Sequence, residues 1–173
     1  MPEPLVHFAV PFALFTAKGM DARKAALLSL IAVLPDLDVL IHVHRSYTHS
    51  IFIPIALLVA AAIWRRGSKP LVLASLSLAT HSILDFVTYY TPILWPVYAG
   101  SLWLKASLDI HVASLPSSVK LSIQLLQQPA SKALASFEEA DFTAASGEGT
   151  LIALALVLTA LIAKRAGRLR GTH

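Results

Sequence analysis

The chain has 173 residues, of which 56% are hydrophobic and 14% charged, and its mean hydropathy is +0.68. This balance lies outside that of ordinary soluble domains and favours a single integral-membrane domain. The absence of cysteine excludes disulfides, thiolate chemistry and thiolate-bound zinc. The net charge of +4 does not indicate a nucleic-acid partner, because the basic residues flank apolar runs.

Six apolar runs follow one another along the chain: residues 4–17, 22–41, 51–64, 71–87, 92–104 and 150–163. Several are shorter than the roughly 20 residues of an ideal membrane span. They are nevertheless apolar on all faces, which argues against the alternative of a soluble helical bundle. We therefore expect an all-α fold, a polytopic transmembrane helical bundle of about five spans, in which residues 92–104 re-enter the membrane or lie at its surface.

Clusters of lysine and arginine predict the topology. They are Lys18, Arg23 and Lys24; Arg65, Arg66 and Lys69; and Lys164, Arg165, Arg168 and Arg170. The positive-inside rule places all three in the cytoplasm. We expect a multi-pass protein of the cell membrane (inner or plasma membrane) whose residues 1–173 form one domain, with the N-terminus outside and the C-terminus in the cytoplasm. Residues 105–148 would form a small extracytoplasmic insertion.

Within that insertion, residues 119–125 alternate between apolar and polar side chains, which predicts a strand or a segment lying on a surface. Pro129 is expected to end it, and residues 131–141 have a weakly helical pattern. The tryptophans at positions 64, 95 and 103 are expected to anchor the chain at the membrane interface. A functional role for the nearby pair Asp109 and His111 is the less favoured interpretation.

Three polar motifs interrupt the apolar sequence, at residues 35–38 (Pro-Asp-Leu-Asp), 44–50 (His-Arg-Ser-Tyr-Thr-His-Ser) and 81–85 (His-Ser-Ile-Leu-Asp). An ionisable side chain at membrane depth costs about 3 kcal/mol, so such residues indicate a function. In the expected topology these motifs and His7 reach one depth near the outer face. Histidine and carboxylate side chains are ligands of divalent metals, so the pattern predicts a membrane-embedded metal site.

The spacing within the motifs adds geometry. His81 and Asp85 are four residues apart and would share one face of a helix. Pro35 is expected to break or kink its helix, and an extended Asp36-x-Asp38 would point both carboxylates the same way. Thr48 and Ser50 are candidate caps of the helix that follows them.

The motifs resemble those of the YdjM-like family, which comprises predicted membrane-bound, metal-dependent hydrolases of bacteria and archaea. The resemblance covers residues 7 to about 96 and is carried by His7, Leu34-Pro35-Asp36-Leu37-Asp38, His44-Arg45 with Thr48-His49-Ser50, His81-Ser82-Ile83-Leu84-Asp85 with Thr88, and residues 92–96. This chain has Val39 and Ser46 where many members have histidine and glycine. The family is thought to be distantly similar to zinc-dependent phospholipase C, which implies a phosphoester substrate such as a lipid or isoprenoid phosphate.

The candidate metal ligands are His7, Asp36, Asp38, His44, His49, His81 and Asp85. A catalytic zinc usually takes three protein ligands, so the set is large enough for two ions, with one ion as the alternative. Zinc is the expected metal, with manganese or magnesium as alternatives. Roles in catalysis are assigned to Arg45, Asp38 and Thr48. The Arg45 guanidinium would bind phosphate in a bidentate manner.

The expected function is therefore a membrane-embedded, phospholipase-like hydrolase that uses metal-activated water at the outer face of the membrane. The alternative is a non-enzymatic ion carrier, or a structural membrane protein with a buried His/Asp site. The chain lacks the internal repeat of many transporters, which favours the hydrolase. The expected partners are membrane lipids and the phosphoester substrate, without nucleic acid, and the sequence leaves the oligomeric state open.

Overall fold

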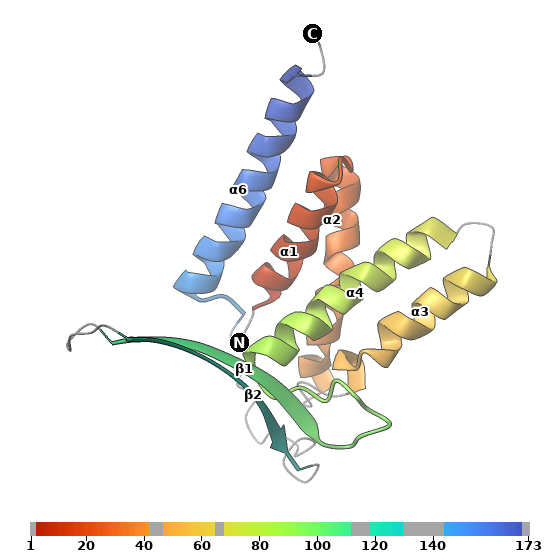
Figure 1. The fold of residues 1–173 in the computed structure, drawn as a ribbon. Coiled ribbons are helices and arrows are strands. Elements are labelled where there is room, and N and C mark those ends of the chain that lie inside the picture. The colour runs from red at the N-terminus through yellow and green to blue at the C-terminus, as the bar shows by residue number, and fades with distance from the viewer. Residues whose placement is uncertain (1–2, 42–46, 65–67, 112–117, 130–143, 171–173) are drawn as a thin grey trace.

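The computed structural model describes residues 3–41, 47–64, 68–111, 118–129 and 144–170. Helices extend from one end of the molecule, where a two-stranded ribbon lies across their ends (Figure 1). In chain order the elements are α1 (Pro4–Ala17), α2 (Ala22–Ile31), the 3-10 segments η1 (Leu34–Ile41) and η2 (Tyr47–His49), α3 (Phe52–Ile63), α4 (Ser68–Thr88), β1 (Ser101–His111), β2 (Ser118–Gln128) and α6 (Gly147–Arg170).

Local sequence signals determine where the first two helices begin and end. Pro4 occupies the first turn of α1, where a missing N–H costs nothing. Gly19 has φ of 85°, a conformation that favours glycine, and it allows the chain to turn back after α1. Asp21 then caps α2, because its side chain accepts a hydrogen bond of 3.0 Å from the Arg23 backbone N–H.

The helices pack in two groups that share α4. The α1 helix contacts both α2 and α6, and α3 lies along α4. A small core of Phe12, Phe15, Ala25 and Ala160 joins α1, α2 and α6. At the ribbon end, the Glu3 carboxylate accepts a hydrogen bond of 2.6 Å from the Ser146 backbone N–H and so ties the start of α1 to the start of α6.

The ribbon is an antiparallel pair in which β1 is in register with β2 from Ser101 opposite Gln128 to His111 opposite Ser118. Reciprocal backbone hydrogen bonds of 2.9 Å between Thr91 and Leu102 fix its base to the segment that follows α4. Gly100 is needed at this base, because a Cβ there would lie 2.7 Å from the Gln128 carbonyl oxygen.

The expectation of an all-α bundle of about five spans is wrong. Among the described residues, two helices are long and apolar enough to cross a membrane: Ser68–Thr88 and Gly147–Gly167. The α1 and α3 helices have 14 and 12 residues, which at 1.5 Å per residue is about 21 and 18 Å against a hydrocarbon core of about 30 Å. Residues 22–41 do not form one span, because α2 ends at Ile31 and Pro35 lies in a 3-10 segment.

Residues 92–104, expected to re-enter the membrane or lie at its surface, are not helical: 93–97 form a turn and β1 begins at Ser101. The prediction of a strand over 119–125 is confirmed, and β2 ends at Gln128, directly before Pro129. The segment expected to be weakly helical, 131–141, lies outside the described residues.

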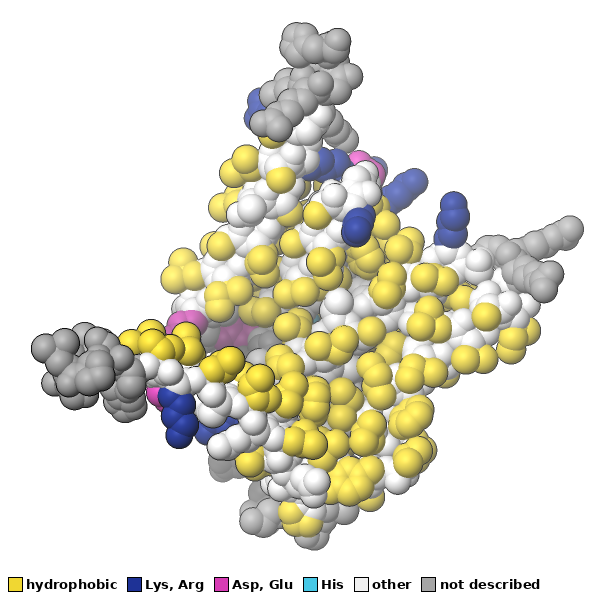
Figure 2. Space-filling view, viewed as in Figure 1, with side chains coloured by type: hydrophobic (Ala, Val, Ile, Leu, Met, Phe, Trp, Pro, Cys, Tyr) yellow, Lys and Arg dark blue, Asp and Glu magenta, His cyan; other side chains and the backbone are white. Residues whose placement is uncertain are grey.

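Apolar side chains cover much of the visible surface, whereas lysine and arginine gather mainly at the end opposite the ribbon (Figure 2). Large exposed side chains include Leu27, Leu30, Ile63, Leu151 and Ile162, each more than half exposed. The basic clusters lie where α1 ends, where α2 and α4 begin and where α6 ends, and Figure 1 shows these helix ends pointing away from the ribbon.

Candidate metal centre

Six ionisable side chains from four separate segments converge inside the protein, near the ribbon end of the helices. Each is at most 5% exposed. They are His7 near the start of α1, Asp36 and Asp38 on η1, His49 at the end of η2, and His81 and Asp85 on the last turns of α4. Burial of so many titratable groups is costly unless they are paired or bound to a metal.

The α4 pair behaves as its spacing predicts. His81 Nε2 lies 3.3 Å from Asp85 Oδ2, one helical turn away on the same face. The same carboxylate oxygen lies 3.3 Å from His49 Nε2, and the other oxygen, Oδ1, lies 3.4 Å from His7 Nε2. Asp85 therefore faces three imidazoles, with one oxygen toward His7 and the other toward His49 and His81.

The η1 carboxylates do not point the same way. Residues 36–38 lie in a 3-10 helix, so the extended conformation that would point both carboxylates the same way is not adopted. Asp36 Oδ1 lies 3.8 Å from His49 Nε2 and 3.9 Å from His81 Nε2, whereas Asp38 Oδ2 lies 3.4 Å from His49 Nδ1. The two aspartates thus approach opposite nitrogens of one imidazole.

Some of the donor atoms are close enough together that they could hold a metal ion. Separations of 3.3, 3.3, 3.8 and 3.9 Å link the nitrogens and oxygens of four residues: His49 Nε2, His81 Nε2, Asp36 Oδ1 and Asp85 Oδ2. A tetrahedral zinc with bonds of about 2.0–2.1 Å holds neighbouring ligand atoms about 3.3–3.4 Å apart. The separations from Asp85 Oδ2 to His49 and His81 match that spacing, whereas those from Asp36 Oδ1 exceed it.

Unsatisfied polar atoms support the same interpretation. Both ring nitrogens of His7 and of His81, together with Asp36 Oδ2, are buried without a hydrogen-bond partner among the described residues. Buried polar groups are otherwise almost always paired. Two overlapping groups, His7–Asp36–His81 and His49–His81–Asp85, offer ligand atoms that lie within 4.8 Å of one another and could hold a metal ion.

Thr48 and Asp38 orient the His49 ring from behind. The Thr48 hydroxyl donates a hydrogen bond of 3.0 Å to Asp38 Oδ2 and lies 3.0 Å from His49 Nδ1. With Nδ1 held in this way, Nε2 points toward Asp36 and Asp85. A carboxylate behind a ligating histidine fixes the ring orientation and raises its basicity. Asp38, expected as a ligand, lies in this supporting position.

The electrostatics around His49 favour a positive charge in the metal-free protein. Burial lowers the pKa of this imidazole, but Asp36, Asp38 and the charge of Asp85 outweigh burial and raise the pKa to about 9. A metal ion that binds His49 at neutral pH must therefore displace a proton.

We expect Thr48→Val to weaken metal binding by about 10- to 100-fold, the usual cost of losing a group that orients a ligand. Valine keeps the shape of threonine but cannot bond to Asp38 or His49. Competition titration with a chelating dye measures the affinity, and Thr48→Ser, which keeps the hydroxyl, should bind like the native protein. Equal affinity in all three proteins would show that Thr48 does not orient His49.

Ser50 holds this part of the site in place. Its hydroxyl donates to the Trp95 carbonyl oxygen and accepts a hydrogen bond of 3.2 Å from the Phe52 N–H. The N-cap of α3 is Ile51, which has no side-chain cap bond, so the expectation that Thr48 or Ser50 caps this helix is wrong. The link to Trp95 spans 45 positions, and no local sequence signal predicts it. Two residues of the expected site, His44 and Arg45, lie outside the described residues.

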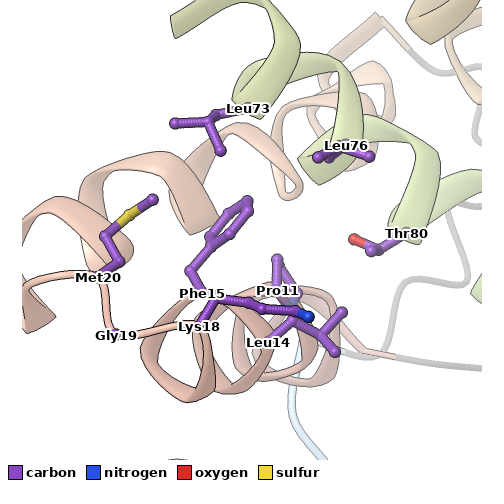
Figure 3. A pocket seen from close by; sticks show the side chains of 9 residues that line it. All are labelled: Pro11, Leu14, Phe15, Lys18, Gly19, Met20, Leu73, Leu76 and Thr80. Carbon is purple, nitrogen blue, oxygen red and sulfur yellow. The ribbon is translucent and has the colours of Figure 1, made fainter. Parts of the chain in front are cut away.

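An apolar pocket of about 520 Å³ lies between α1 and α4 (Figure 3). It is lined by Pro11, Leu14, Phe15, Lys18, Gly19, Met20, Leu73, Leu76 and Thr80. Pro11 is one helical turn from His7, and Thr80 precedes His81. The lining therefore extends along α1 from Pro11 to the basic end of that helix. Its lining residues resemble any apolar helix face, so no sequence pattern predicts it.

Comparison with known proteins adds no relative: no family model, curated protein or solved structure matches the chain.

Proposed function

We propose that this protein is a membrane-embedded, metal-dependent hydrolase that cleaves a phosphoester. The observation that carries the proposal is the buried convergence of three histidines and three aspartates from four segments. The resemblance of the motifs to the YdjM-like family supports it independently of the geometry. A bound metal would supply activated water and stabilise the developing charge of the phosphoryl group.

Different residues would bind the metal ion, orient its ligands and bind the substrate phosphate. His49, His81, Asp36 and Asp85 would hold the ion, and His7 approaches the same carboxylate from the other side. Asp38 and Thr48 orient His49. Arg45, only four positions before His49 in the sequence, would bind the substrate phosphate through its guanidinium.

Zinc is the metal that this donor set supports best, because imidazole and carboxylate are its usual nitrogen and oxygen ligands. Manganese also accepts such a mixture. The two potential ligand groups share His81, and the two Asp85 oxygens face different histidines. This arrangement supports a second ion beside the first, and elemental analysis of purified protein would distinguish one ion from two.

The proposed location is the cell membrane, with the basic end of the molecule in the cytoplasm. Two long apolar helices and the abundance of exposed apolar side chains support the membrane setting. Lysine and arginine at the ends of α1 and α6 and at the starts of α2 and α4 support the orientation. The metal cluster would then lie toward the outer face, and the C-terminus in the cytoplasm.

The substrate that suits this site carries a long alkyl or isoprenyl chain. The pocket in Figure 3 has apolar walls from α1 and α4, and its lining residues Pro11 and Thr80 are close to His7 and His81 in the sequence. Pockets of this size bind ligands mainly through apolar contact. A lipid phosphate would place its phosphate at the cluster and its chain along α1 and α4.

The direct test is hydrolysis of a long-chain lipid phosphate by the purified protein in detergent or vesicles, with and without added zinc. Zinc-dependent release of phosphate supports the proposal. Steady uptake of zinc into protein-containing vesicles, without hydrolysis of any phosphoester offered, would instead identify an ion carrier.

Leu76→Trp is expected to lower kcat/KM about tenfold for a long-chain phosphate, because the indole would displace about two methylene groups worth about 0.8 kcal/mol each. A short-chain, water-soluble phosphoester should be hydrolysed at an unchanged rate. Leu154→Trp, on an exposed part of α6, is the matched control and should leave both rates unchanged. Equal loss for both substrates would show that the pocket does not hold the chain.

A further inference from the structure

The β1–β2 ribbon has two chemically different faces. One face is entirely apolar along four successive cross-strand pairs: Leu104–Leu125, Ala106–Ile123, Leu108–Leu121 and Ile110–Val119. The other face carries the pairs Lys105–Gln124, Ser107–Ser122 and Asp109–Lys120. Successive side chains of a strand point to opposite faces, so this division follows directly from the alternating sequence of both strands.

No described residue covers the apolar face. Six of its seven large side chains, Leu108, Ile110, Val119, Leu121, Ile123 and Leu125, are 54% to 67% exposed, and Leu104 near the base is half-buried. A two-stranded hairpin is at best marginally stable alone in water, and an uncovered apolar strand face promotes aggregation. The apolar face therefore needs an apolar environment that the described part of the chain does not provide.

The polar face is suited to water. The hydroxyls of Ser107 and Ser122 lie 2.7 Å apart in a hydrogen bond across the strands. Asp109 is directly opposite Lys120, an arrangement that favours charge pairing. The Lys105 ammonium lies 5.4 Å from the centre of the Trp103 ring.

The apolar and polar faces of the ribbon are oriented differently relative to the helices. In Figure 1, α4 and α6 extend from one side of the ribbon. In Figure 2, the apolar side chains of the ribbon line the edge that faces α6, and its charged side chains lie on the opposite edge. The apolar face is thus on the same side as the two helices that are long enough to cross a membrane.

Aromatic residues lie near the ribbon, at the same end of the molecule. At the base of the ribbon the Trp103 ring lies 5.7 Å from that of Tyr89 and 5.4 Å from that of Tyr90. Tyr47 and Trp95 form a second pair with ring centres 4.3 Å apart, beside η2. Tyrosine and tryptophan concentrate at the boundary between lipid and water, and the basic clusters lie at the opposite end.

We propose that the ribbon lies flat in the outer membrane–water interface, with its apolar face against the lipid chains and its polar face in water. The partner is a lipid surface, and the ribbon acts as an amphipathic anchor built from strands rather than from a helix. The proposal rests on the membrane location proposed above, but it does not depend on the hydrolase activity.

The absence of cysteine from the chain allows a direct test. Single cysteines at four consecutive positions of β2, Leu121, Ser122, Ile123 and Gln124, would each carry an environment-sensitive fluorophore in protein reconstituted into phosphatidylcholine vesicles. Positions 121 and 123 should emit at shorter wavelength and be quenched by nitroxide-labelled lipid. Positions 122 and 124 should be quenched several-fold more strongly by aqueous iodide.

Iodide access that does not alternate along the four positions would overturn the proposal. The alternation in iodide access should also persist when the protein is diluted with excess lipid. Its loss on dilution would mean that a second copy of the chain, and not lipid, covers the apolar face, and this result would overturn the proposal. Co-flotation of the native protein with vesicles serves as a separate control. Failure to float would refute the membrane location, whereas flotation without alternation would refute only the interfacial ribbon.

Discussion

His81→Ala is expected to abolish metal binding and hydrolysis together. His81 belongs to both potential ligand groups, and its Nε2 lies 3.3 Å from Asp85 Oδ2 and 3.9 Å from Asp36 Oδ1. Loss of a central electrostatic group in a catalytic site typically reduces turnover by about 10²- to 10³-fold, and loss of the ion itself should exceed that range. Metal content by elemental analysis and phosphate release measure the two effects on the same preparation.

Asp85→Asn separates metal binding from packing. Asparagine keeps the size of the buried side chain but lacks the negative charge that faces His7, His49 and His81. We expect a folded protein without metal and without activity. Asp109→Asn and His111→Ala, on β1, are matched controls that should retain both. An active, metal-loaded Asp85→Asn protein would contradict the assignment of this carboxylate as a ligand.

Removing the ion is expected to lower the free energy of unfolding by about 4 kcal/mol relative to protein in metal at a thousandfold excess over Kd. The physical reason is that three carboxylates, Asp36, Asp38 and Asp85, are buried close together, and their negative charge destabilises the fold unless a positive charge compensates it. A proton on His49 supplies part of that charge in the metal-free state. Thermal unfolding with and without a chelator measures the difference.

The His81→Ala protein provides the control for this stability effect, because it should unfold at the same temperature with and without chelator. A native protein whose unfolding temperature does not respond to chelator would contradict a metal centre in this cluster. It would leave the histidines and aspartates as a buried network stabilised only by its own contacts.

Much of the candidate site can be predicted from the sequence, because ionisable residues are rare in such an apolar chain and each stands out. The i,i+4 spacing of His81 and Asp85 is enough to predict their contact on one face of a helix. The roles of Asp36 and Asp38 cannot be predicted in this way, since they depend on the 3-10 conformation after Pro35 and on the position of His49 between them.

The fold is harder to predict, because apolar composition does not distinguish a membrane span from a shorter helix or a strand. The run at 92–104 has the composition of a helix, yet its last residues begin β1. The alternation in β2 is visible in the sequence, but its partner is not, since the pairing of Leu108 with Leu121 depends on contacts between two segments. The end of α2 at Ile31 also shortens the expected span 22–41.

The contact between α1 and α6 has a consequence for the order of folding. The α6 helix contributes none of the six cluster residues, but it packs against α1, which carries His7. The hydrogen bond from the Ser146 N–H to Glu3 connects the start of α6 to the start of α1. The helix that supports the first ligand is thus synthesised after every segment that carries a ligand. On the ribosome the contact between α1 and α6 therefore forms only after all six cluster residues have been synthesised.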